Sequence, residues 1–482
     1  MTAAEEPVTA LVDRCFLVGV PGTTAEATPA AFRDWLAAGL GGVVLFGENV
    51  EDSQQLARLC SELREIGDDV VLAVDEEGGD VTRLHARDGS PTPGNLALGA
   101  LDDVALTRST ARSIGAELRA TGITLDLAPA VDVTTRAENP VIGTRSFGAD
   151  PQLVARHGVA YLEGMQAAGV AACAKHFPGH GDTTVDSHLD LPVVDGDLEP
   201  HLVPFRAVVD AGVDAVMCAH ISYPALDEEP ASLSRRILTD LLRGELGFRG
   251  AVVTDSLTMA AVAGRVGLAE GCVRALAAGA DLLCMNSPLA QQLAARDHVV
   301  AAVRDGRLPV ERVREAASRV RALARPRPVT EAAGPPVEFT GELGRRTLHV
   351  DLADGLPAGL PYVIEAVPPR AGVEPSAASL LHAMQALDPA VDGARLVSGG
   401  PALTAALEAA RSRPLVLVVR DAHRDPAQRD LLDTVRAHRH DAVVVGTGTT
   451  ADAHLAAGRY VGARSAAAVS LLAVAELLLA RR

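Results

Sequence analysis

One stretch of the chain holds most of the residues that could do chemistry. Residues 175–188 read KHFPGHGDTTVDSH, in which a lysine, three histidines and two aspartates alternate with glycine and proline. The stretch follows an apolar run at residues 170–174, and this order predicts a buried strand that ends at Lys175 and leads into a long polar loop. Catalytic groups are commonly placed at such strand ends.

The lysine that opens this stretch is unusual in the composition. Lys175 is the only lysine of the chain, whose other basic residues of the Lys and Arg types are all arginine. A chain that uses arginine as its general cation is expected to keep a lysine where a planar guanidinium does not fit. The alternative is a lysine that persists by chance at the surface.

The elements that must position these residues follow a βα rhythm. From residue 16 to about residue 325, short apolar runs alternate with amphipathic segments rich in alanine and leucine. Eight such runs have the number and spacing of a (β/α)8 TIM-type barrel with insertions, in the α/β class. A doubly wound open sheet is the alternative, but no GxGxxG motif follows the first run. The predicted strands are residues 16–20, 42–46, 70–74, 124–128, 171–174, 215–219, 251–254 and 282–285.

Polar side chains follow most of these predicted strands, and the carboxyl ends of barrel strands share one face. A lone aspartate after a strand can instead cap the next helix. For Asp132, His220 and Asn286, taken singly, both interpretations stay open. The polar residues in question are Asp75, Asp132, Lys175, His176, His220, Asp255 and Asn286.

The sequence predicts three divisions along the chain. Residues 1–325 form the barrel, residues 326–340 are a linker rich in proline and glycine, and residues 341–482 form a small αβα sandwich. In the third division, apolar runs at 362–367, 414–419 and 442–445 alternate with helical segments. The cluster RDAHRD at residues 420–425 follows one of these runs, and we expect it to be a salt-bridged, solvated loop.

Composition limits the class of partner and the compartment. The net charge of -18 argues against nucleic acid as a ligand and leaves a small molecule. Six cysteines without a CxxC pair predict buried reduced thiols, with no zinc site. The acidic start of the chain does not resemble a signal peptide, and no apolar run has the roughly 18 residues of a membrane helix. We therefore expect a cytoplasmic protein without metal, cofactor or membrane partner; the oligomeric state is left open.

Several motifs in one order resemble the β-N-acetylglucosaminidases of glycoside hydrolase family 3, which in bacteria trim muropeptides during cell-wall recycling. The resemblance covers roughly residues 10–325, while the C-terminal part is similar only in general to the second domain of some members. The motifs are KHFPGHGDTTVDSH, VDEEGGDVTRL (74–84), LDLAPAVDV (125–133), NPVIGTRSFG (139–148) and VVTDSLTM (252–259).

The resemblance implies a retaining glycosidase that removes terminal β-linked N-acetylglucosamine. It implies that Asp255 is the nucleophile and that Asp186 and His188 form an acid/base dyad. Members commonly carry arginine after the double glycine, where this chain has Asp80, and this puts nearby contacts and leaving-group preference in doubt. The residues implied to hold the sugar ring are Asp75, Arg83, Arg145, Lys175 and His176.

The residue types are chemically suited to these roles, although other functions stay open. A retaining glycosidase needs a carboxylate on one side of the anomeric carbon and a proton donor on the other, and a histidine titrates near neutrality. Transfer of the glycosyl group to phosphate instead of water is the first alternative, and a silent sugar-binding protein is another. A metal-dependent barrel hydrolase is a further one; its ligands would be His176, His180, Asp182, Asp186 and His188.

Overall fold

The computed structural model describes residues 6–184, 191–332, 334–356, 358–367, 378–397 and 399–480. They form two compact units. The first contains the chain up to Glu76 together with Val104–Val141 and Ala149–Pro336, and the second contains Glu77–Asp103, Ile142–Gly148 and the chain from Val337 onward. Two segments that lie between barrel strands in the sequence therefore fold with the C-terminal part of the chain. The division of the sequence at residues 326–340 stays a prediction.

An eight-stranded parallel sheet forms the first unit, in the order β10-β1-β2-β3-β4-β5-β6-β9. A parallel bridge between Val253 and Leu282 brings the two ends of this sheet together, which completes the barrel. All eight predicted barrel strands are present, and the predicted fold class is confirmed. The strands are β1 (Phe16–Gly19), β2 (Gly42–Leu45), β3 (Val71–Val74), β4 (Leu125–Asp126), β5 (Ala171–Phe177), β6 (Ala215–Cys218), β9 (Ala251–Thr254) and β10 (Leu283–Met285).

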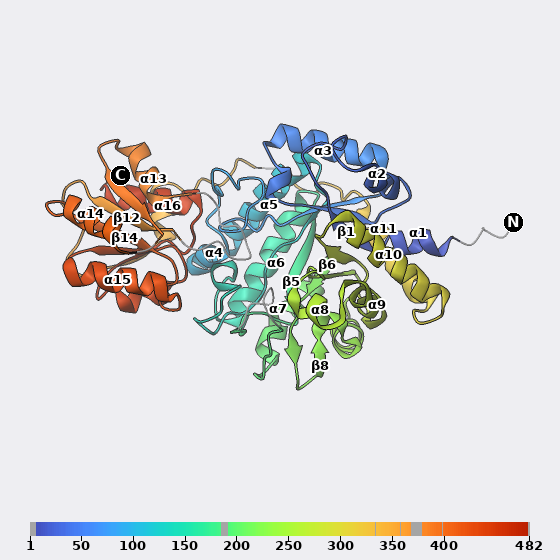
Figure 1. Cartoon of the computed structure of the whole chain (residues 1–482). Coiled ribbons are helices and arrows are strands. Elements are labelled where there is room, and N and C mark those ends of the chain that lie inside the picture. The colour runs from blue at the N-terminus through green and yellow to red at the C-terminus, as the bar shows by residue number, and fades with distance from the viewer. Residues whose placement is uncertain are drawn as a thin grey trace. The chain divides into compact units, whose positions relative to one another are not determined.

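Helices surround these strands (Figure 1). They are α1 (Val8–Asp13), α2 (Ala30–Ala37), α3 (Ser53–Ile66), α5 (Val104–Thr121), α6 (Pro151–Ala167), α7 (Glu199–Asp210), η4 (Arg236–Glu245), α8 (Ala260–Val266), α9 (Leu268–Ala278), α10 (Leu289–Arg304) and α11 (Val310–Ala324). The short turns η1 (Gly47–Asn49) and η3 (Ala231–Leu233) and the hairpin β7 (Ser222–Tyr223) and β8 (Asp227–Pro230) lie in the loops.

Most residues of the barrel strands are apolar because both faces of the strands are covered, although β5 also carries Lys175 and His176 and β4 carries Asp126. Leu17, Val44 and Val253 belong to the cluster of buried side chains that fills the barrel interior. Val320 and Leu323 of α11 join the same cluster, so this helix packs against the interior-facing side chains of the strands. The packed interior leaves the strand ends as the place where polar groups can gather.

A six-stranded sheet in the order β11-β16-β15-β14-β12-β13 forms the second unit. All its strands are parallel except β11, which pairs antiparallel with β16 at the edge. The strands are β11 (His349–Leu352), β12 (Tyr362–Ala366), β13 (Asp392–Leu396), β14 (Leu415–Val419), β15 (Val443–Gly446) and β16 (Arg459–Gly462). The helices and turns are α4 (Asn95–Leu101), η2 (Gly143–Arg145), α12 (Gly341–Arg346), α13 (Leu380–Leu387), α14 (Pro401–Ala409), α15 (Pro426–His438), η5 (Thr450–Leu455) and α16 (Ala468–Leu478).

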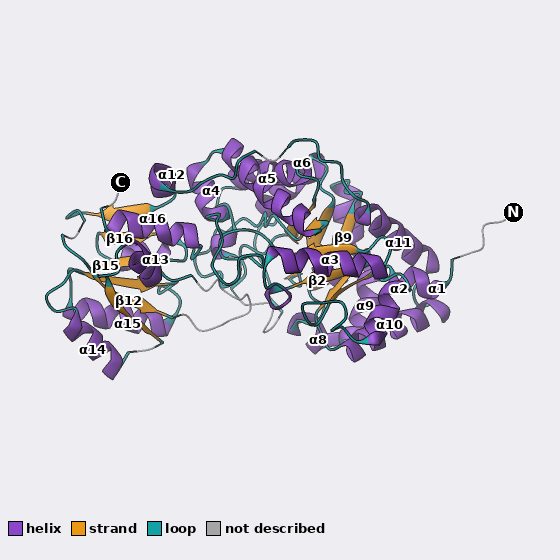
Figure 2. Cartoon of the chain, turned by 90° about the horizontal axis from the view of Figure 1, so that it is seen from above, coloured by secondary structure: helices purple, strands orange, loops and turns teal. Residues whose placement is uncertain are grey.

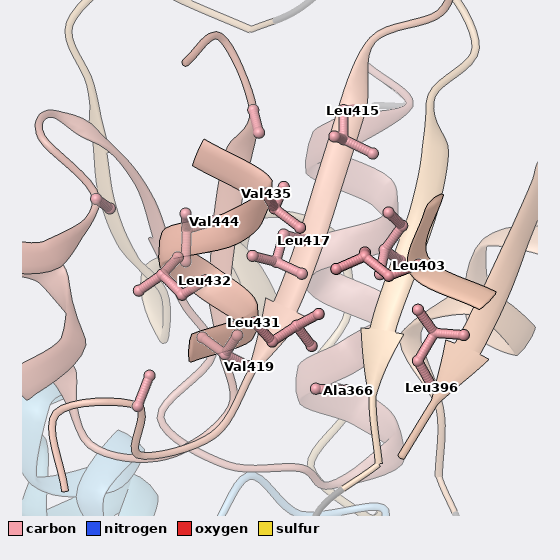
Figure 3. Close-up of a cluster of buried hydrophobic side chains, with 14 of the residues drawn as sticks. Ala366, Leu396, Leu403, Leu415, Leu417, Val419, Leu431, Leu432, Val435 and Val444 are labelled. Carbon is pink, nitrogen blue, oxygen red and sulfur yellow. The ribbon is translucent and has the colours of Figure 1, made fainter. Parts of the chain in front are cut away.

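This sheet is covered on both faces, as Figure 2 shows. Leu403 of α14 and Leu432 of α15 pack on Leu417 and Val444 on one face, the cluster drawn in Figure 3. On the other face, α13 and α16 pack on alternate residues of the same strands. The predicted αβα arrangement is therefore observed.

All six cysteines are buried and unpaired. None of the described helices combines the length and the apolar character needed to cross a membrane.

Candidate active site

A buried ion pair connects two barrel strands at their carboxyl ends. Lys175 lies in β5, and its Nζ is 2.5 Å from Oδ1 of Asp75, which directly follows β3. The Lys175 side chain is 1% exposed, whereas that of Asp75 is 21% exposed. The carboxylate can therefore reach a ligand from the top of the barrel while the ammonium stays beneath it. The only lysine of the chain lies in the interior, so its location at the surface is excluded.

A second network joins β5 to the loop after β4. Asp132 accepts hydrogen bonds from Nδ1 of His176 at 2.8 Å and from the backbone N–H groups of His176 and His180 at 3.2 and 2.6 Å. Burial alone would raise the pKa of Asp132, but the neighbouring His176 and His180 lower it to about 2. Asp132 is thus an ionised acceptor that orients the His176 ring.

Asp255 directly follows β9 and is half-buried. Its backbone N–H donates to the carbonyl of Cys218 at 3.0 Å, which continues the pairing of β9 with β6. Its Oδ1 accepts a hydrogen bond from the N–H of Ser256 at 2.7 Å. These contacts fix the position of this carboxylate at the mouth of the barrel.

The pKa values of two buried groups show which charges lie near one another. Burial raises the pKa of the Cys284 thiol, Asp255 and Asp75 raise it further, and Lys175 lowers it. Burial also lowers the pKa of His180 to about 4, with a contribution from His176 and an opposing effect of Asp132 and Asp255. The charged groups after β3, in β5 and after β9 act on common neighbours, as expected at one end of a barrel.

The loop that begins after β5 is anchored at its described start. Nδ1 of His180 and Oγ1 of Thr183 are 2.8 Å apart, and the side-chain amide of Asn139 donates to the carbonyl of His180 at 2.8 Å. Asp182 accepts from the hydroxyl of Thr135 and lies 3.4 Å from Nε2 of His201. The two residues predicted to form the acid/base dyad, Asp186 and His188, lie outside the described residues.

The two predicted sugar-binding arginines belong to the second compact unit. Arg145 ends η2 and binds Glu77 through Nε at 3.0 Å and Nη2 at 2.7 Å, a two-point ion pair in which the Glu77 side chain is 2% exposed. Arg83 follows in the segment Glu77–Asp103 and is half-buried. Paired guanidinium and carboxylate groups of this kind keep further N–H donors in a fixed plane.

Two of the other polar residues after predicted strands differ in their surroundings. Nδ1 of His220 is 2.7 Å from the hydroxyl of Ser232, and its Nε2 is 3.0 Å from the carbonyl of Ser256, so it braces the residue next to Asp255. Asn286 is exposed and lines a cavity of about 330 Å³ at the ends of β1 and β10. Asp132 contacts His176 and His180, which sequence position alone did not indicate.

No role was assigned from the sequence to two further acidic residues, although Glu77 belongs to the polar run after the third predicted strand. Glu77 pairs with Arg145 as described, and Asp126 of β4 is buried with its Oδ1 3.0 Å from the N–H of Glu76, the residue after Asp75. Burial raises the pKa of Asp126 well above its usual range. The signal that could have identified Glu77 is its place in the run DEEGG, directly after a predicted strand.

Among the described residues, no group of three or more histidines, cysteines or carboxylates is arranged to hold a metal ion. Of the ligands proposed for a metal site, His176 and His180 contact Asp132, and Asp182 contacts Thr135 and His201. The described part of the site thus offers carboxylates, an ammonium group and imidazoles joined in pairs, which suits hydroxyl recognition and attack by a carboxylate.

Residues 21–323 match the family described as glycosyl hydrolase family 3 N terminal domain. A β-hexosaminidase of Thiobacillus denitrificans is 44% identical over 271 residues, which cover 53% of this chain and 75% of that relative. The motifs that carried the resemblance all lie within or overlap this range.

Two solved structures extend the comparison. A glycoside hydrolase family 3 β-N-acetylglucosaminidase from Paenibacillus sp. is 31% identical, with a TM-score of 0.86 and coverage of 99% of this chain and 97% of that chain. A β-N-acetylhexosaminidase from Beutenbergia cavernae is 34% identical, with a TM-score of 0.62 and coverage of 67% of this chain and 99% of that chain. The first similarity therefore spans both units of the chain.

Proposed function

Because the chain belongs to glycosyl hydrolase family 3 and is a glycosidase, we propose that it removes terminal β-linked N-acetylglucosamine, with retention of configuration, from peptidoglycan fragments or related N-acetylglucosaminides. The observation that carries the proposal is the gathering of Asp75, Lys175 and Asp255 at one end of the barrel. The β-N-acetylglucosaminidase from Paenibacillus sp., which resembles the chain over its whole length, supports the choice of sugar.

Asp255 is the nucleophile of the proposed reaction. Its carboxylate attacks the anomeric carbon while His188 donates a proton to the leaving oxygen, so the glycosidic bond breaks as the glycosyl-Asp255 bond forms. In the second step His188 takes a proton from water, the water oxygen bonds to the anomeric carbon, and Asp255 leaves as a carboxylate. The bond from Ser256 N–H to Asp255 Oδ1 supports this role because it limits the orientations of the carboxylate.

Asp186 and His188 are assigned to proton transfer from the sequence. Asp186 lies two residues before His188, close enough in a turn for its carboxylate to accept from one ring nitrogen and orient the other. The contacts of His180, Thr183 and Asp182 support the assignment because they anchor the chain just before this pair.

Five residues are assigned to the sugar ring. Asp75 and Lys175 form the pair that offers a carboxylate and an ammonium group to hydroxyls, and Asp132 keeps His176 oriented beside them. Arg83 and Arg145 supply the guanidinium donors, and the two-point pairing of Arg145 with Glu77 fixes its plane. This set has the donor and acceptor types that a neutral, hydroxyl-rich ligand requires.

Product analysis with 4-nitrophenyl N-acetyl-β-D-glucosaminide, in buffers with and without phosphate, tests the proposed function. We expect nitrophenol and free N-acetylglucosamine at a rate that phosphate leaves unchanged. If N-acetylglucosamine 1-phosphate is the main product, phosphate and not water is the acceptor of the glycosyl group. A protein that cleaves only the matching glucoside would contradict the choice of sugar.

A further inference from the structure

Asp80 follows the double glycine of the segment Glu77–Asp103, and its carboxylate accepts four hydrogen bonds. Oδ1 accepts from the hydroxyl of Ser465 at 3.0 Å and from the N–H of Ala466 at 2.6 Å. Oδ2 accepts from the hydroxyl of Thr144 at 2.6 Å and from Nη2 of Arg420 at 2.8 Å. All five residues belong to the second compact unit.

The donors come from two parts of that unit. Arg420 directly follows β14, and Ser465 and Ala466 lie between β16 and α16, so they stand at the carboxyl edge of the parallel strands. This edge is where ligands bind in open α/β sheets. In this protein the side chain of Asp80 accepts hydrogen bonds from donors at this edge of the sheet.

The site for Asp80 is built for a charged carboxylate. The side chain is 9% exposed. Burial alone would raise its pKa, but the charge and hydrogen bond of Arg420, with the hydrogen bonds of Thr144 and Ala466, lower it. Loss of the carboxylate would leave a guanidinium, two hydroxyls and an N–H without their acceptor.

Asp80 is also connected to both segments that carry the proposed sugar-binding arginines. Thr144, which donates to Asp80, directly precedes Arg145 in η2. Arg145 pairs with Glu77, three residues before Asp80, and its carbonyl accepts from the side-chain amide of Asn95 at 2.7 Å. Arg83 follows Asp80 by three residues.

The backbone around Asp80 is tightly packed as well. Gly79 has a φ of 62°, and a Cβ placed on it would lie 2.6 Å from Cα of Gly94. Its N–H donates to the carbonyl of Thr92 at 3.1 Å. The backbone next to Asp80 therefore leaves little room for local adjustment.

We propose that Asp80 is a positioning residue through which the C-terminal sheet holds Arg83 and Arg145 in place for the sugar. The inference rests on the proposed function, which assigns those arginines to substrate. It gives the second compact unit a role in substrate binding, without a catalytic residue in that unit. Asp80 acts through its neighbours, because its carboxylate joins Thr144 to Arg420, Ser465 and Ala466.

Steady-state kinetics of full-length variants with 4-nitrophenyl N-acetyl-β-D-glucosaminide test the inference. Asp80→Ala and Arg420→Gln should each lower kcat/KM by between about tenfold and a hundredfold, mainly through a higher KM, because displaced arginines bind the sugar less well. The double variant should lose little more than either single variant, since both remove the same contact. Thr144→Val removes one donor and should give a smaller rise in KM.

Asp441→Asn is the matched control. Asp441 forms a two-point pair with Arg439, both bonds at 2.8 Å, just before the amino end of β15 in the same sheet. The Asp441→Asn variant should have a changed melting temperature and the wild-type KM. Thr144→Val keeps the test valid if Asp80→Ala does not fold.

The possible outcomes separate this inference from the proposed function. If the wild type is active and the folded Asp80, Arg420 and Thr144 variants keep the wild-type KM, the positioning role alone would be overturned. An equal rise in KM for Asp441→Asn would also overturn it, because the effect would then be one of general stability. A wild type that does not cleave the substrate would overturn the proposed function and with it this inference.

Discussion

The Lys175–Asp75 pair shows why the choice of a residue type can carry information. Lys175 is 1% exposed in β5, with Nζ 2.5 Å from Asp75, and burial of this kind leaves no room for a longer, planar head group. The composition suggested this position because no other lysine exists in the chain. The hydrogen-bonding partner could not be read from the sequence, because it lies 100 residues away.

Lys175→Arg should therefore be far from conservative. We expect kcat/KM to fall by more than about a hundredfold, and stability to fall by about 1–3 kcal/mol because the larger side chain overpacks the interior. Kinetics and thermal melting measure the two effects. Arg206→Lys, at an exposed pair with Glu199, serves as the control and should change neither. Wild-type behaviour of Lys175→Arg would show that the site accepts any cation.

His180 should make stability depend on pH in a defined window. Its pKa is lowered by burial from 6.5 to about 4, so the unfolded chain binds this proton first as the pH falls. The free energy of unfolding should decrease from pH 6.5 to pH 4, by on the order of 3 kcal/mol from this group. The lowered pKa of Asp132, from 3.8 to about 2, matters only below about pH 4.

Urea unfolding of the wild type and of His180→Gln at several pH values measures this contribution. The variant has no ionising group at this position, so the stability difference between the two proteins should shift in favour of the variant as the pH falls through the window. A difference that stays constant between pH 7 and pH 4.5 would contradict the account.

At the scale of elements, apolar pattern predicted the central strands well. The eight barrel strands and β12, β14 and β15 are buried on both faces, so their sequences are mainly apolar. The strands that the sequence did not reveal are β11, β13 and β16. The first two lie at the edges of their sheet and are partly exposed, which removes the apolar signal, and β16 has only Tyr460 and Val461 as apolar side chains.

A buried cluster of charged residues lies at the amino-terminal end of the barrel strands. Asp281, before β10 and fully buried, accepts from Arg243 at 2.5 Å, from Arg312 at 2.5 Å and from Arg319 at 3.1 Å. These arginines come from η4 and α11, so the carboxylate ties two helices to the amino-terminal end of the barrel. The candidate active-site groups lie at the opposite, carboxyl end of the strands.

Asp281→Asn should lower the free energy of unfolding by about 3–5 kcal/mol, because three arginines lose their counter-charge in a buried setting. The folded variant should keep the wild-type kcat/KM, since the change lies at the end of the barrel away from Asp255. Chemical unfolding and kinetics on the same preparation check both parts. Asp305→Asn, at an exposed pair with Arg307, is the control. A stable variant with reduced activity would contradict the assignment.

At the scale of the whole molecule, the sequence predicted a barrel and a sandwich but could not predict which loops fold with which sheet. Asp80 and Arg420 are 340 residues apart, and no local pattern marks them as partners. The cluster at residues 420–425 is salt-bridged as expected, with Arg424 2.7 Å from Asp421, but it is only partly solvated, because Arg424 is exposed while Asp421 and Ala422 are buried. Asp421 is 8% exposed, and His423 lies 2.7 Å from the fully buried Asp452.

In the proposed mechanism, Asp255 becomes covalently bound to the sugar. Incubation with a slow fluorinated N-acetylglucosaminide, followed by digestion and mass spectrometry, tests it directly. We predict one sugar on the peptide that contains residues 253–259, and neither labelling nor turnover in Asp255→Ala, which should keep its fold. A label on Asp75 or Asp132 would contradict the account, as would an active Asp255→Ala variant.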